Sequence, residues 1–126
     1  MKIAITLNES AGLASSVSRV FARCMYIMFI DSETKEFTIE ENRATHEASG
    51  AGIKAAQYLI KQGVGAVISG DIGPKAASVL AAEGIKKYRV QGKTAGEALE
   101  SYLNGELESL YSSTNQMYTG KRQDDK

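Results

Sequence analysis

Residues 65–74 read GAVISGDIGP, and this stretch decides the class of fold. Its first half is short, apolar and rich in β-branched residues, which predicts a buried strand over residues 65–69. Two glycines then allow a tight turn, and Pro74 suits the first position of a helix, where its missing N–H is not needed. A strand that passes straight into a helix is the repeating unit of an α/β domain.

A helix is predicted directly before this stretch, and a strand and a further helix are predicted after the helix that Pro74 begins. Apolar residues recur at helical spacing over residues 53–60, and Gly63 ends that helix. The next helix ends at Gly84 in the same way, and a strand is predicted over residues 85–90. A capping box of threonine and glutamate at residues 94–97 opens a third helix.

The N-terminal part of the chain shows strand patterns only. Residues 2–7 and 24–30 are apolar runs, whereas residues 37–41 alternate apolar and charged side chains, as a half-exposed strand does. The short turn before residues 37–41 predicts a hairpin, and polar residues 8–18 predict a long loop. We therefore expect one α/β domain over residues 1–110, with the order βββαβαβα and a mixed five-stranded sheet flanked by helices.

Composition narrows the classes of function. The 126 residues include 15 basic and 15 acidic side chains, so there is no electrostatic footprint for nucleic acid or an anionic membrane. We see no run long enough to span a bilayer and no signal-peptide pattern. Because a lone cysteine forms no internal disulfide, we expect a reducing cytoplasm. Polar residues 111–126 are predicted to be a disordered tail.

The predicted topology gathers a candidate site at one edge of the sheet. The carboxyl ends of the parallel strands and the starts of all three helices meet there, where ligands of open α/β sheets bind and free N–H groups suit an anion. The turn at residues 69–74 supplies Gly70 and Gly73, and a second glycine-rich helix start supplies Ser49, Gly50 and Gly52. The alternative for the first segment is an ordinary strand-to-helix turn, and the alternative for the second is close packing of small residues. Neither matches the Walker or dinucleotide glycine pattern.

Two further pairs of residues are expected at the same edge. Arg19 and Arg23 precede the second strand, where they either meet an anionic ligand or lie solvated on the surface. Cys24 and His46, the only thiol and the only imidazole, either offer one soft and one borderline metal ligand or serve as packing and surface residues. The chain has no nucleophile elbow, so we expect a binding protein rather than an enzyme.

Residues 1–110 resemble the nitrogenase iron–molybdenum-cofactor biosynthesis family in the order and spacing of short motifs. The matching pieces are Met1-Lys2-Ile3-Ala4-Ile5, Val17-Ser18-x-x-Phe21-x-Arg23, Asp31, Asn42, Gly50-Ala51-Gly52, Gly63-Val64, Ser69-Gly70, Gly73-Pro74-x-Ala76 and Leu80-x-x-x-Gly84-Ile85. The family fold is similar to a ribonuclease H-like α/β sheet. The usual family run Ser-x-His-Phe-Gly-Arg differs here, because Val20 replaces the histidine and Ala22 the glycine.

The resemblance implies a carrier that binds an iron–sulfur or iron–molybdenum type cluster, or its precursor, and passes it to a cluster-assembly or acceptor protein. In this interpretation the cofactor-binding residues are Asn8, Ser18, Arg23, Ser49, Gly50, Gly52, Gly70 and Gly73, and the metal ligands are Cys24 and His46. Cys24→Ala is then expected to weaken cluster binding. The alternative, motivated by the missing family histidine, is a metal-free module that binds a small anion or a partner protein.

Overall fold

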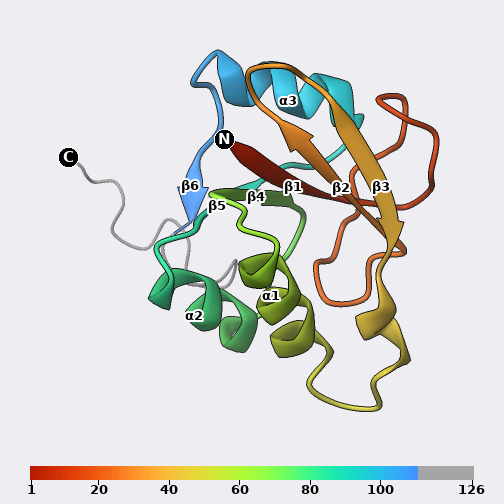
Figure 1. The fold of residues 1–126 in the computed structure, drawn as a ribbon, viewed down its shortest axis with the longest axis vertical. Helices are drawn as coiled ribbons and strands as arrows, with labels where there is room; N and C mark the ends of the chain where they lie inside the picture. The colour runs from red at the N-terminus through yellow and green to blue at the C-terminus, as the bar shows by residue number, and fades with distance from the viewer. Residues whose placement is uncertain (111–126) are drawn as a thin grey trace.

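The computed structural model describes residues 1–110 as one sheet with helices on both faces (Figure 1). Helices α1 and α2 lie against one face of the sheet, and α3 lies against the other. The elements are β1 Lys2–Leu7, β2 Tyr26–Asp31, β3 Phe37–Glu41, the 3-10 helix η1 Arg43–His46, α1 Ala51–Lys61, β4 Ala66–Ser69, α2 Pro74–Ala82, β5 Lys86–Arg89, α3 Ala95–Leu103 and β6 Ser109–Leu110.

The sheet order is β3-β2-β1-β4-β5-β6. Strands β1, β4 and β5 are parallel, whereas β2 and β3 form an antiparallel hairpin beside β1. The predicted α/β class, the element order and the five strands of a mixed sheet are therefore confirmed. The two-residue strand β6, which pairs antiparallel with β5, was not predicted. The ribonuclease H-like label stays a prediction, and the predicted tail of residues 111–126 lies outside the described residues.

The start of one strand and the presence of one short helix differ from the sequence prediction. The second strand was predicted from residue 24, but β2 begins at Tyr26, because the N–H of Cys24 donates to the Phe21 carbonyl in a turn (3.3 Å). The 3-10 helix η1 was not predicted. It forms after Asn42, whose side chain caps it by accepting a hydrogen bond from the N–H of Ala44.

The sheet separates two cores, as alternating side chains dictate. On one face Ile27, Phe29 and Val67 pack against the alanines and leucines of α1 and α2. On the other face Met28 and Ile68 pack with α3. Each core is a cluster of buried apolar side chains between the sheet and the helices on that face.

The topology brings strand ends and helix starts together at one edge of the sheet, as expected. Here β1, β4 and β5 end, and α1, α2 and α3 begin; we call it the loop edge (Figure 1). The loop of residues 8–25 between β1 and β2 lies at this edge too. Within residues 1–110, no helix combines the length and the apolar character that crossing a membrane requires.

Candidate functional site

The turn after β4 holds the loop of residues 8–25 in place through backbone contacts. The N–H of Asp71 donates to the carbonyl of Arg19 (2.7 Å), and the N–H of Phe21 donates to the carbonyl of Asp71 (2.9 Å). A Cβ atom at Gly70 would lie 2.2 Å from the carbonyl oxygen of Arg19. Gly70 is therefore required for close approach of two backbones. The space next to Gly70, where the sequence suggested a ligand, is filled by the backbone of Arg19.

Two of the three helix N-termini at the loop edge have no side-chain cap. Helix α1 follows Gly50, which has a left-handed φ of 74°, and α2 follows Gly73; neither helix has an acidic residue in its first turn. Helix α3 differs, because Thr94 and Glu97 close its start with the predicted capping box. The first-turn N–H groups of α1 and α2 thus lack a side-chain acceptor, and both positive dipole ends remain uncompensated.

The starts of α1 and α2 lie close together (Figure 1). A Cβ atom at Gly52 would lie 3.3 Å from the Cβ of Ala76 and 3.5 Å from the Cβ of Ala22, so Gly52 lets both helices and the loop meet. Lys54 and Lys75, near the starts of α1 and α2, are both exposed. Positive side chains near helix N-termini are electrostatically unfavourable on their own. This part of the loop edge therefore suits an anion.

Arg23 holds the segment that leads into α1. Its Nη1 atom donates to the carbonyls of Thr45 (2.9 Å) and Glu47 (3.0 Å) at the end of η1. The side chain is exposed, so these hydrogen bonds compete with water. Arg23 thus has a structural role at the loop edge, and its predicted contact with a ligand stays a prediction.

The other predicted polar residues are placed as follows. Ser18 is buried, and its Oγ donates to the carbonyl of Val20 (2.8 Å). Asn8 is exposed, and its Nδ2 donates to the Oγ of Ser16 (2.9 Å). Ser49 is exposed just before the start of α1. Ser18 and Asn8 therefore shape the loop from within, whereas Ser49 lies where a ligand at α1 could reach it.

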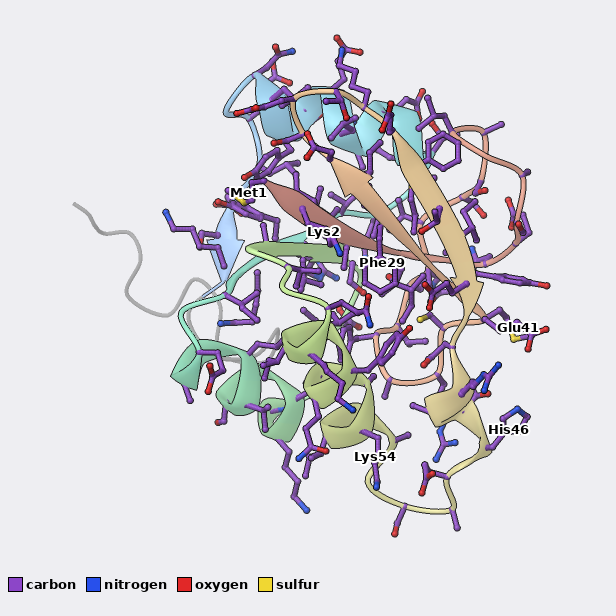
Figure 2. All side chains as sticks on the ribbon, in the orientation of Figure 1. Met1, Lys2, Phe29, Glu41, His46 and Lys54 are labelled. Carbon is purple, nitrogen blue, oxygen red and sulfur yellow. The ribbon has the colours of Figure 1, made fainter. Side chains whose placement is uncertain are left out.

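Cys24 and His46 lie in opposite environments. Cys24 is 2% exposed, and the Nδ2 of Asn42 donates to its Sγ atom (3.4 Å). Burial raises the pKa of the Cys24 thiol to about 12, so the thiol stays protonated at neutral pH. His46 is exposed in η1 and projects away from the body of the molecule (Figure 2). Because the thiolate is the ligand form of cysteine, this geometry gives no support to a joint metal site.

The described part of the chain also contains no other cluster of metal-ligating residues. Among residues 1–110, no group of three or more His, Cys, Asp or Glu side chains could hold a metal ion. Val20, at the position of the usual family histidine, is 45% exposed, and its backbone bridges to Asp71 at the loop edge. A histidine at this position would be accessible, whereas valine offers no ligand atom.

Sequence reasoning missed one ion pair at the loop edge. The Nε atom of Arg89, at the end of β5, donates to Oδ1 of Asp71, in the turn after β4, over 2.9 Å. The two side chains meet because Ser69 and Arg89 are partners in the parallel ladder. Both residues lie at the carboxyl ends of neighbouring parallel strands, which is the signal that would have found them. The pair ties the end of β5 to the turn that leads into α2.

Comparison with known proteins agrees with this fold. The dinitrogenase iron-molybdenum cofactor family matches residues 1–105. An uncharacterized protein from Methanocaldococcus jannaschii is 33% identical over 113 residues, covering 87% of this chain and 92% of the relative. The apo form of the orange protein from Desulfovibrio gigas is similar in structure, with a TM-score of 0.85 and 32% identity over 89% of this chain and 94% of that one.

A second solved structure supports the same conclusion. It belongs to a Thermotoga protein proposed to be a NifB protein, with a TM-score of 0.74 and 35% identity. The likeness covers 86% of this chain and 91% of that one. The family match spans nearly the whole described domain, and the two solved relatives share its length as well as its fold. The chain therefore belongs to the dinitrogenase iron-molybdenum cofactor family.

Proposed function

We propose that the protein is a carrier, not an enzyme, that binds an anionic metal–sulfur cluster or its precursor at the loop edge and passes it to a partner protein. The family match supports this class of cargo, and the uncapped helix starts support a site for an anion at the loop edge. The observation that carries the proposal is the pair of adjacent, uncapped starts of α1 and α2, with no acidic residue in either first turn.

The donor set of the loop edge indicates how such a cargo would be held. Backbone N–H groups and the ammonium groups of Lys54 and Lys75 can donate to the sulfide or oxide atoms of an anionic cluster. Cys24 is buried with a pKa raised to about 12, so it is poorly placed to supply a thiolate. We therefore expect the cluster to be held by hydrogen bonds and charge, and Cys24→Ala to retain it, in contrast to the expectation from sequence.

The test is anaerobic reconstitution with iron and sulfide, with and without molybdate, followed by absorption spectroscopy and analysis of bound metal and sulfide. Stoichiometric metal with charge-transfer bands is expected for the wild type and for Cys24→Ala, and much less metal for Lys75→Glu. Lys86→Glu is the matched control, because Lys86 is exposed at the start of β5, on the opposite edge of the sheet. Loss of metal in Cys24→Ala would restore the thiolate role, and a colourless wild type would count against the carrier.

The second candidate function is a metal-free module that binds a small anion. The same uncapped helix starts favour it, together with valine at the position of the family histidine. Thermal unfolding of the metal-free protein in phosphate, sulfate or molybdate tests this module, since any ligand of the native state raises the melting temperature. A melting temperature that stays constant across these anions, at matched ionic strength, would exclude the small-anion module.

A further inference from the structure

The free edge of the sheet at β3 presents a defined set of unpaired backbone groups. Strand β3 pairs with β2 only, and no other described strand lies beyond it (Figure 1). At the two ends of this hairpin, the N–H of Asn42 donates to the carbonyl of Met25 (3.0 Å), and the N–H of Asp31 donates to the carbonyl of Glu36 (2.9 Å). Hydrogen-bonded pairs recur at every second residue of an antiparallel ladder. The N–H and C=O groups that point away from β2 therefore belong to Phe37, Ile39 and Glu41.

The charges along this edge determine what can pair with it. Residues 31–41 contain five acidic side chains and one lysine, and Glu36 and Glu41 are exposed at the two ends of β3. Two copies of the chain that paired through β3 would bring glutamates close to glutamates, which is unfavourable. A segment with basic side chains would be attracted instead. The charge pattern thus disfavours a second copy and favours a basic partner.

The two faces of the edge offer different surroundings to the side chains of an added strand. On the α1 side, a cavity of about 690 Å³ lies between the end of β3, η1 and α1, with Glu40, Glu47 and Lys54 among its lining residues. A second cavity of about 470 Å³ continues along β3 past Phe29. Figure 2 shows Phe29 and Lys54 on this side of the sheet. On the other face Phe37 is 39% exposed.

We propose that the β3 edge binds a basic, extended segment of a partner protein, which adds to the sheet as a further strand. The outward backbone groups of β3 would supply the affinity, as in other cases of strand addition. Acidic residues outnumber basic ones in the lining of both cavities, by three to two in the first, where Arg43 and Lys54 are the basic ones, and by three to one in the second, where Lys2 is. Basic side chains of the segment would face these acidic residues, and apolar ones would cover Phe37. The proposal does not depend on a bound cluster, so it can be tested on the metal-free protein.

The probe is a short, end-capped peptide of alternating lysine and valine, long enough to span β3. Binding is followed by calorimetry, and its mode by amide hydrogen exchange under the same conditions. The expected result is binding that slows exchange at Phe37, Ile39 and Glu41. A peptide of alternating glutamate and valine should not bind, and neither should the lysine–valine peptide with a central proline, which cannot form the ladder.

Ile39→Pro is the matching change in the protein. It removes one outward N–H without removing a donor from the β2–β3 ladder, and proline is tolerated on edge strands in that orientation. We expect binding of the lysine–valine peptide to weaken by at least about tenfold. The double variant Glu36→Lys with Glu41→Lys leaves the backbone intact and keeps the test valid even if the proline variant folds poorly. It should lose the basic peptide and gain the acidic one.

The charge control is Glu83→Lys with Glu100→Lys, two exposed positions at the C-cap of α2 and on α3 that should leave binding unchanged. Three results would overturn the proposal. The first is equal binding of the proline-interrupted peptide, which would show simple charge attraction. The second is no binding at low salt. The third is a concentration-dependent dimer that Ile39→Pro abolishes, which would assign the edge to a second copy of the chain.

Discussion

Replacing Gly73 by aspartate should stabilise the fold while weakening ligand binding at the loop edge. Gly73 is the N-cap of α2 and has an extended backbone, with φ −66° and ψ 163°, that any residue can adopt. A Cβ atom at this position would meet no heavy atom within 4 Å. Aspartate therefore fits without strain, and its carboxylate can accept hydrogen bonds from the first-turn N–H groups. These are the same groups that we assign to an anionic ligand.

The gain in stability can be estimated from three effects. Replacing glycine where the backbone is compatible restricts the unfolded chain and contributes about 0.4–1 kcal/mol. A charged cap next to the helix dipole adds about 0.3–1 kcal/mol, and the cap hydrogen bond a few tenths more than glycine gives. The sum is about 1–2 kcal/mol. For a domain of about 110 residues this corresponds to a rise of roughly 4–8 °C in melting temperature.

The assay is thermal unfolding by circular dichroism, first without ligand and then with molybdate. The wild type should gain stability from the anion, whereas Gly73→Asp should start higher and gain little. Thr94→Ala is the control, since it removes the cap of α3 and should lose about 1 kcal/mol while keeping the full response to the anion. An undiminished anion response in a stabilised Gly73→Asp would show that the start of α2 is not the binding site. A destabilised variant would refute the N-cap argument itself.

Three further changes test the structural roles assigned above. Gly70→Ala should cost about 3 kcal/mol or more in urea unfolding, because its Cβ would collide with the Arg19 carbonyl; a loss below about 1 kcal/mol would refute that contact. Cys24, with its pKa raised to about 12 by burial, should react with iodoacetamide at pH 8 at least about a hundredfold more slowly than in the unfolded chain, as mass spectrometry would show. The same shift in pKa means that stability is unaffected well below pH 9 and declines as the pH rises through 9 towards 12, because the unfolded thiol ionises first; Cys24→Ala should reduce this decline. Arg23→Gln should speed amide exchange in η1 with a global cost under about 1 kcal/mol; unchanged exchange there would show that its two carbonyl contacts hold nothing.

The fold was predictable because its strong signals are local. Glycines at residues 63 and 84 end two helices with positive φ of 77° and 74°, as their positions in the sequence indicated. The capping box that starts at Thr94 and the proline at the start of α2 are also where the sequence placed them. The element η1 was not predictable in this way, because it depends on the Asn42 cap and on Arg23, which is distant in the sequence. Strand β6 is too short to leave a periodic pattern.

The candidate site was predictable in place but not in the role of each residue. Topology alone put the glycine-rich turns and helix starts at one edge. A glycine in the sequence indicates that some group packs closely against the backbone, but it does not indicate whether that group is a ligand, another backbone segment or a side chain. At Gly70 the neighbour is the backbone of Arg19, and at Gly52 it is the side chain of Ala76. Cys24 is buried in the core on the α1 and α2 face and contacts Asn42, an arrangement of residues distant in the sequence that no local pattern encodes.

The two proposed surfaces are connected by a short path through the structure. Strand β3 ends at the loop edge, where the side chain of Asn42 donates to the carbonyls of Ala22 and Cys24 (3.0 Å each). Ala22 in turn packs at the position where α1 begins beside Gly52. A partner strand added along β3 would therefore end next to the uncapped helix starts that we assign to the cargo. A carrier needs both a place to hold its cargo and a place to dock its acceptor, and transfer over a short distance keeps a labile cluster away from water. If the β3 edge binds the basic peptide but the loop edge binds no cluster or anion, this functional link fails even though each surface could still exist alone.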